Sequence, residues 1–342
     1  VLAEELKTTK VPHDVLRHGV EASGVPVPAL VVALRETLSH GEWLHWGATS
    51  QDVVDTALVL CLKDALATAS ARLSTLIDRL HRLSHDHAST ILAGRTWTQI
   101  AAPTTFGLWV ARWAQPLIVL ERELPDLGRH ALRIQFGGAV GNNAVGYPHG
   151  AEISRAMADM LGLSDGPPWH SDRTALYSLA AWFGRLTQAL AKMAGDLSLL
   201  ARTEIGEVSF ASGGGSSTMP QKSNPVRAQT VGTLNTLVQA DVSGLLSSGP
   251  HLEDRDGAPW LAERVLLPQI AIRTGAALRH GFWLAEAVKP NIGNMAKTLD
   301  QNPGAMAEAA TFALARFMPR SEAQTLVKQA LGSPGSFIEA LS

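Results

Sequence analysis

Apolar residues recur at helical spacing over long stretches of this chain. Between Asp55 and His87 they follow the i, i+3, i+4, i+7 spacing of one helix face, at Leu73, Leu76, Ile77, Leu80 and Leu83. No proline or glycine interrupts this run. About thirty residues at about 1.5 Å each span roughly 45 Å, so this helix needs neighbours of similar length to cover its apolar face.

Four further stretches repeat the pattern and supply those neighbours: residues 104–124, with a kink expected around Pro116, and residues 174–201, 226–246 and 260–288. Alternating strand patterns are nearly absent. The pattern therefore predicts an all-α fold built on a long five-helix central bundle.

Shorter helical patterns flank this bundle. We expect a helical N-terminal domain over residues 1–45, the bundle over 46–287 and a small helical C-terminal domain over 288–342, where the composition shifts to Asn, Gly and Pro. The first residues, VLAEELKTTK, resemble the middle of a helix. We therefore expect the N-terminal domain to lack its beginning.

Composition adds limits on partners and location. Hydrophobic residues make up 46% of the 342 residues and charged ones only 18%, which leaves apolar surface on a single copy and favours an oligomer. A net charge of −2 provides no basic field for nucleic acid or for a membrane surface. No run is long enough for a transmembrane helix, and no signal or transit peptide is visible. The one cysteine, Cys61, is expected in the core, and a cytoplasmic location is expected.

Candidate chemistry is densest in residues 213–225, GGGSSTMPQKSNP, between two of the helical stretches. A Gly/Ser-rich stretch is often a flexible linker, but the sequel MPQKSNP argues against that interpretation. Glycines let backbone N–H groups approach a ligand, and Lys222 with Asn224 can meet developing negative charge. The stretch therefore predicts a functional loop.

This run resembles the GSSxMPxKxNP signature of the fumarase/aspartase superfamily. Every defined position is present, at Gly215, Ser216, Ser217, Met219, Pro220, Lys222, Asn224 and Pro225. The resemblance implies the long helical bundle of that superfamily and an active site that includes this loop.

A second block, HWGATSQDVVDTA, places Thr49 and Ser50 ahead of a helix, with Asp52 and Asp55 in its first turns, where negative charge suits the helix dipole. On their own these residues could form only a helix cap. The block also resembles one shared by carboxymuconate cycloisomerases and adenylosuccinate lyases. That resemblance implies that Thr49 and Ser50 contact a substrate carboxylate.

A third block, AGRTWTQIAAPTTFG, has the composition of a loop over a site. It resembles the superfamily run GRTHxQxAxPTTxG, in which the histidine is a general acid, but here that position is Trp97. Indole cannot protonate an amine leaving group, whereas a carboxylate leaving group needs no proton. The version with tryptophan is similar to the motif of the 3-carboxy-cis,cis-muconate cycloisomerases.

The resemblance to those cycloisomerases implies that a muconate carboxylate adds to carbon 3 and that Ser216 transfers a proton at carbon 2. Lys222 and Asn224 would stabilise the enediolate-like charge. The substrate, a small polycarboxylate, would be bound by Thr49, Ser50, Arg95, Thr96, Trp97, Gln99, Ser217, Met219 and Arg255. No cofactor or metal is expected, since no metal-ligand spacing recurs. Like its relatives, the protein would be a homotetramer with active sites shared between chains.

Some features leave alternatives open. Asp172 could cap the following helix, whereas Arg173 could bind a carboxylate. The alternating charges between Glu253 and Glu263 are typical of a solvated, salt-bridged surface. The glycine-rich segment 135–150 lacks a preceding strand and the GxGxxG register, which argues against a dinucleotide site.

Two other functions also remain open. The segment around His13 resembles one in adenylosuccinate lyases, so an amine-eliminating lyase is an alternative. A non-catalytic, crystallin-like structural oligomer is another, because the superfamily includes such proteins. The intact Ser216, Lys222 and Asn224 argue against the structural role.

Overall fold

The structure, a computed structural model, describes residues 1–210, 214–215, 219, 222–333, 337 and 340. The chain divides into two compact units. Unit 1 comprises Val1–Ala71, Leu120–Thr187 and Leu234–Ala276, and unit 2 comprises Arg72–Val119, Gln188–Thr233 and Ala277–Ser342. The dividing points fall inside the long helices, so each of these helices contributes one part to each unit. The predicted domains 1–45, 46–287 and 288–342 stay predictions.

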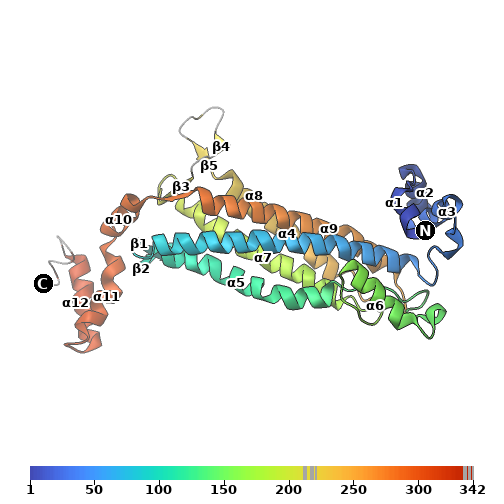
Figure 1. Cartoon of the computed structure of the whole chain (residues 1–342). Coiled ribbons are helices and arrows are strands. Elements are labelled where there is room, and N and C mark those ends of the chain that lie inside the picture. Colours follow the sequence, from blue (N-terminus) through green and yellow to red (C-terminus); the bar gives the residue numbers. More distant parts are fainter. Residues whose placement is uncertain (211–213, 216–218, 220–221, 334–336, 338–339, 341–342) are drawn as a thin grey trace. The chain divides into compact units, whose positions relative to one another are not determined.

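All five predicted long stretches are helical (Figure 1), which confirms the all-α class. They are α4 (Ser50–Asp86), α5 (Phe106–Ala131), α7 (Thr174–Leu200), α8 (Val226–Leu246) and α9 (Gly257–Ala287). The helix α9 continues through Pro268, and α5 continues through Pro116. Within the described residues, no helix has the length and apolar character needed to cross a membrane.

Short helices complete unit 1. They are α1 (Leu2–Thr8), α2 (His13–Ser23), α3 (Val27–Thr37) and α6 (Gly150–Leu161), with single 3-10 turns η1 (Gly41–Trp43) and η2 (Ala144–Gly146). Pro12 precedes α2, and Gly24 ends it in a left-handed conformation with φ of 69°. The helix α2 packs on α3, so this region is helical as the sequence predicts.

Unit 2 carries three two-stranded ladders and the last helices. The strands β1 (Ile91–Thr96) and β2 (Gln99–Thr105) form one ladder, β3 (Val208–Phe210) and β6 (Val288–Pro290) the second, and β4 (Gly214–Gly215) and β5 (Ser223–Asn224) the third. The chain continues as α10 (Ile292–Asp300), the 3-10 turn η3 (Pro303–Met306), α11 (Ala307–Leu314) and α12 (Arg320–Gly332). In Figure 1, α11 and α12 lie side by side, and the two helices are in contact.

The cores follow the helical periodicity. The predicted positions Leu73, Leu76, Leu80 and Leu83 of α4 are buried. Cys61 was expected in the core, but it is exposed. The reason is the helix period. Val59, Leu62 and Leu66 point inward, and Cys61 therefore lies on the opposite face of the helix.

Candidate active site

Asp52, in the first turn of α4, organises the second motif block, HWGATSQDVVDTA, within unit 1. Its carboxylate accepts hydrogen bonds from the backbone N–H groups of Thr49 (2.9 Å), Gly137 (3.1 Å) and Gly138 (2.9 Å). His170 Nε2 lies 2.7 Å from the same carboxylate, and both side chains are buried. Asp52 thus caps its helix, as expected, but it also ties the Thr49–Ser50 turn to a loop more than eighty residues away.

The two glycines in this loop are required by close packing. A Cβ atom at Gly137 would lie 2.7 Å from the imidazole of His170, and one at Gly138 would lie 2.8 Å from the carbonyl oxygen of Gly47. Gly138 also has a φ of 73°, a conformation that side chains disfavour. The glycine-rich segment therefore serves as a close-fitting partner of Asp52.

Arg255 belongs to the same region of unit 1. Its Nη2 donates to the carbonyl oxygens of Ala139 (2.8 Å) and Gly138 (3.4 Å), so the loop held by Asp52 also holds Arg255. The hydroxyls of Thr49 and Ser50 make no hydrogen bond within the described part of the chain, and both residues are half-buried. The structure thus brings three of the predicted substrate-binding residues into one neighbourhood, with two hydroxyls available to a ligand.

Behind this neighbourhood lies a buried ionic cluster in unit 1. Arg173 donates to both carboxylate oxygens of Asp55 (2.6 and 3.1 Å) and to Glu263 (2.6 Å from Nη2). Side-chain exposure is at most 1% for these three residues. Trp260 Nε1 donates to Asp55 at 2.8 Å, and His251 Nε2 lies 3.1 Å from Glu263.

This cluster shows how Glu263 and Arg173, two charged residues with open roles in the sequence, are used in the fold. Glu263 was predicted on a solvated surface, which is wrong, because helix α9 turns this residue toward Arg173. Asp172 caps the start of α7, because it accepts hydrogen bonds from the N–H (3.2 Å) and hydroxyl (2.6 Å) of Thr174. Arg173 does bind carboxylates, but not those of a ligand. Those carboxylates are the protein's own. Arg173 therefore serves to hold the fold together.

The pKa of Arg173 reflects the same balance. Burial by itself lowers this pKa, but the carboxylates of Asp55 and Glu263 outweigh burial, so the pKa is raised. The guanidinium also stacks on Trp169, 4.5 Å from the ring centroid. Arg173 is thus a permanently charged centre that holds three helices of unit 1 to one another.

The third motif block, AGRTWTQIAAPTTFG, forms a β-hairpin in unit 2. The loop predicted from its composition is therefore wrong. Thr96 of β1 pairs with Gln99 of β2, which leaves Trp97 and Thr98 as a two-residue turn. Both turn residues have positive φ, 52° and 64°, as type I′ hairpin turns require. Such turns usually contain Asn or Gly, so the sequence carried no turn signal here. The Trp97 side chain is 97% exposed at the tip.

Arg95 is anchored at the base of this hairpin. Its Nη2 donates to Glu207 Oε1 at 2.8 Å, and its Nη1 donates to the carbonyl oxygen of Ala93 at 3.2 Å. Glu207 is fully buried, and its Oε2 has no hydrogen-bond partner among the described residues. Sequence reasoning missed Glu207, and no motif marked it. Thr96 and Gln99 lie exposed on the same hairpin.

The signature loop is closed at its base by the β4–β5 ladder, in which Gly214 pairs with Asn224 and Gly215 with Ser223. Lys222 is exposed, Asn224 is half-buried, and Met219 is 42% exposed. The predicted catalytic Ser216 and the predicted substrate-binding Ser217 lie outside the described residues. The paired base shows that this segment is anchored on both sides, unlike a free linker.

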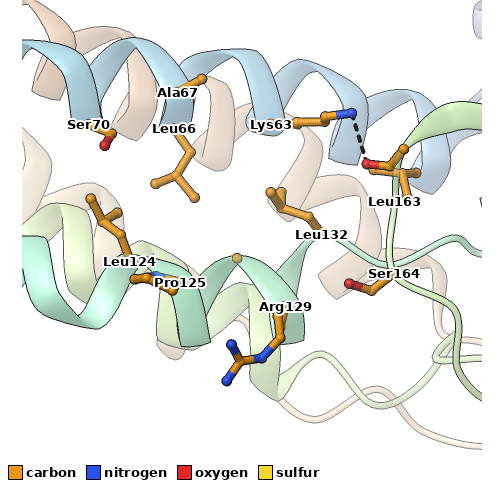
Figure 2. Close-up of a pocket in the computed structure, with 12 residues that line it drawn as sticks. Lys63, Leu66, Ala67, Ser70, Leu124, Pro125, Arg129, Leu132, Leu163 and Ser164 are labelled. Carbon is orange, nitrogen blue, oxygen red and sulfur yellow. Dashed lines mark hydrogen bonds between the residues drawn. The ribbon is translucent and has the colours of Figure 1, made fainter.

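A pocket of about 500 Å³ lies in unit 1 between α4 and α5 (Figure 2). Lys63 reaches into its rim, where Nζ donates to the carbonyl oxygens of Gly162 (2.8 Å) and Leu161 (3.1 Å) at the end of α6. No predicted site residue lines this pocket. Its lysine is engaged by backbone carbonyls, so we do not assign the active site there.

Two groups of predicted residues therefore emerge. One, with Thr49, Ser50 and Arg255, lies in unit 1, and the other, with the hairpin and the signature loop, lies in unit 2. In the part of the chain that the structure describes, no cluster of three or more His, Cys, Asp or Glu residues could hold a metal ion. The first group offers hydroxyl and cationic donors and the second also offers amide donors, and all of these suit an anionic substrate.

The fold thus consists of long helices with the motif-bearing segments before them or at their connections, as the resemblance to the fumarase/aspartase superfamily implies. The comparisons with known proteins agree: the family described as "Lyase" matches residues 14–239. The chain belongs to this lyase family, and its resemblance to the fumarase/aspartase superfamily is confirmed.

Individual members of this family show which enzymes the chain is similar to. The chain is 36% identical to a 3-carboxy-cis,cis-muconate cycloisomerase of Pseudomonas putida, over 92% of this chain and 77% of that protein. It is also 36% identical to one of Bradyrhizobium diazoefficiens, over 84% of this chain and 65% of that protein. Among solved structures, the 3-carboxy-cis,cis-muconate lactonizing enzyme from Pseudomonas putida matches with a TM-score of 0.88 and 34% identity, over 94% of this chain and 74% of that one. The chain thus spans 65% to 77% of the length of these two curated relatives.

Proposed function

We propose that this chain is a 3-carboxy-cis,cis-muconate cycloisomerase, which closes a lactone on a muconate in the catabolism of aromatic compounds. The observation that carries the proposal is Trp97, at the tip of a hairpin whose other motif positions match the superfamily. An indole at that position leaves no general acid for an amine leaving group, but a reaction in which a carboxylate adds to an alkene needs none there. The relatives at 36% identity carry this activity in their names.

In the proposed reaction, one carboxylate oxygen attacks carbon 3 and forms the lactone C–O bond. The electron pair of the double bond moves to carbon 2 and into the adjoining carboxylate. Ser216 donates its hydroxyl proton to carbon 2 and regains a proton from solvent, so each turnover converts the substrate anion and one proton into the lactone. Lys222 and Asn224 are donors aimed at the enediolate-like charge, whose stabilisation is the demanding part of the reaction.

Substrate binding follows from the donors that the fold leaves available. The hydroxyls of Thr49 and Ser50 and the guanidinium of Arg255 bind one carboxylate. Thr96, Trp97 and Gln99 at the exposed end of the hairpin contact the substrate, with Arg95 at its base. Ser217 and Met219 in the signature loop complete the site.

We also propose a homotetramer whose active sites combine segments of several chains. Support comes from unit 1, where α8 and α9 expose large apolar side chains, namely Leu237 (42%), Leu261 (44%), Val265 (64%) and Ile272 (66%). Exposed apolar rows on long helices are typical of oligomer interfaces. A cytoplasmic location stays a prediction.

One assay tests the function: the loss of diene ultraviolet absorbance after 3-carboxymuconate is added. Wild type should show the loss, and Ser216→Ala should lose most of it. No activity in wild type would contradict the cycloisomerase, and equal rates would contradict the role of Ser216. Release of fumarate from adenylosuccinate would instead support the amine-eliminating alternative.

Shared sites have their own test. The double variant Thr49→Val/Ser50→Ala and the variant Lys222→Ala should each be nearly inactive. After the two are unfolded and refolded together, hybrid oligomers should regain activity, because some sites then receive only intact segments. A mixture as inactive as its components, with hybrids shown by mass, would mean that each site lies within one chain.

A further inference from the structure

A small pocket of about 260 Å³ lies in unit 2 where α8 begins, and Asn224 is one of its lining residues. Phe210 of β3, Arg227 of α8 and Trp283 of α9 also line it. Asn224, like the lining residues Gly214 and Pro225, belongs to the signature run, whereas Phe210, Arg227 and Trp283 do not. The pocket therefore adds side chains beside the predicted charge-stabilising donors that no motif identifies.

Arg227 is the charged residue among those that line this pocket. Its guanidinium carbon lies 4.4 Å from the centroid of the Trp283 ring, which in turn packs near Phe210 with ring centroids 6.1 Å apart. Stacking holds a guanidinium by its face and leaves the N–H donors at its edge free for a planar anion. Among the described residues, no carboxylate lies within ion-pair distance of Arg227.

A second arginine, Arg279 of α9, acts together with Arg227 on a neighbouring histidine. His280 of α9 has a lowered pKa, first because it is partly buried and then because Arg227 and Arg279 repel a proton there. The Nδ1 atom of His280 is buried and finds no hydrogen-bond partner within the described ranges. Arg279 is exposed and, like Arg227, is paired with no carboxylate that the structure describes.

Arg227 differs in this respect from Arg95 and Arg173, which bind the protein's own carboxylates. A cation that lines a pocket and has no carboxylate partner favours an anion as the ligand of that pocket. The edge of a guanidinium matches a carboxylate with two parallel hydrogen bonds. The pocket is thus suited to a carboxylate group.

We propose that Arg227, stacked on Trp283, binds one carboxylate of the substrate beside Asn224 and makes the enzyme favour tricarboxylates over dicarboxylates. This inference rests on the proposed function, since it assigns a specificity-determining residue to that active site. Trp283 is a positioning residue that fixes the plane of the guanidinium.

The test compares two unreactive ligands, tricarballylate and glutarate, which differ by a single carboxylate on the central carbon. Isothermal titration of the full chain should show wild type binding tricarballylate more tightly. In Arg227→Gln, the affinity for tricarballylate should fall roughly 10- to 100-fold while that for glutarate changes little, the usual effect of losing a charged hydrogen bond. Arg227→Lys should recover only part of the affinity, because an ammonium lacks the planar edge.

A matched control removes the same charge elsewhere. Arg122→Gln changes an exposed arginine of α5 and should leave both affinities unchanged. Trp283→Leu should weaken tricarballylate binding by a smaller factor than Arg227→Gln. If Arg227→Gln keeps the wild-type preference for the tricarboxylate, the inference is wrong.

The outcomes also separate this inference from the proposed function. Wild type that binds tricarballylate through Arg227 but does not consume 3-carboxymuconate would refute the cycloisomerase and leave the carboxylate pocket standing. Wild type that consumes 3-carboxymuconate, with an Arg227→Gln variant equal to it in both kcat/KM and ligand preference, would refute the pocket and leave the cycloisomerase standing.

Discussion

The buried ionic cluster of unit 1 and the exposed cations of unit 2 differ in how their charges are matched. In unit 1, Arg173, Asp55 and Glu263 are at most 1% exposed, and each charge is matched by a protein partner. In unit 2, Lys222 and Arg227 are exposed near the signature loop, and among the described residues neither is paired with a carboxylate. Buried charges must be matched because desolvation is costly, whereas exposed cations can wait for a ligand. We infer that the first set stabilises the fold and the second set serves the substrate.

The strongest test of this comparison is Arg173→Met. It leaves Asp55 and Glu263 buried without their cation, so the free energy of unfolding should fall by about 3–5 kcal/mol. Urea denaturation followed by circular dichroism measures this. The matched control is Arg185→Met, which breaks an exposed pair of unit 1 with Glu123 and should cost less than about 1 kcal/mol. Similar losses in both variants would show that burial does not distinguish the pairs.

Substitutions in the signature loop should lower activity and leave stability nearly unchanged, the opposite of Arg173→Met. Lys222→Ala and Asn224→Ala should each lower kcat by about 10²–10³, equivalent to roughly 3–4 kcal/mol of transition-state stabilisation. Their free energies of unfolding should stay near that of wild type, since both side chains are at least partly exposed. A loss of stability comparable to that of Arg173→Met would place these residues in the structural set and break the comparison.

Glu207 lies between the two sets, because it is a buried carboxylate of unit 2 paired with a predicted substrate-binding arginine. Glu207→Gln keeps the shape but removes the charge, so stability should fall by about 1–3 kcal/mol, and KM should rise as Arg95 loses its anchor. Glu204→Gln, in an exposed pair with Arg202, is the control and should change neither quantity measurably. An unchanged KM with reduced stability would assign Arg95 to the structural set alone.

The smallest effect is expected at Asp172, an exposed carboxylate of unit 1. Hydrogen bonds from the hydroxyl and N–H of Thr174 lower its pKa from the usual 3.8. Its stabilisation is therefore present above pH 3.8 and is lost as the pH falls through the lowered pKa.

Asp172→Ala should accordingly cost about 0.5–1 kcal/mol at neutral pH, because solvent screens an exposed cap. The difference from wild type should shrink in acid, and Asp172→Asn, which keeps an acceptor, should lose less. A difference from wild type that does not change with pH would mean that the carboxylate charge is not responsible.

Much of the helical framework could be predicted from the sequence alone. The periodicity of apolar residues determines α4, α5, α7, α8 and α9, because each helix needs one apolar face wherever it packs. The motif blocks likewise indicated the superfamily, Thr49, Ser50 and the signature loop. These features depend on residues close together in the chain, whose spacing is directly legible.

Other features were decided only by tertiary structure. The hairpin at Trp97 was missed because neither turn residue favours positive φ, so strand pairing and the Arg95–Glu207 contact determine that conformation. The sequence around Glu263 predicts a surface charge, but the fold buries Glu263 against Arg173, which lies 90 residues away in the chain. Arg227 can be assigned a role only because it stacks on Trp283 of another helix. The reason is the same in each case: burial and pairing of a charge depend on partners that the fold brings from far along the chain, and local sequence carries no record of them.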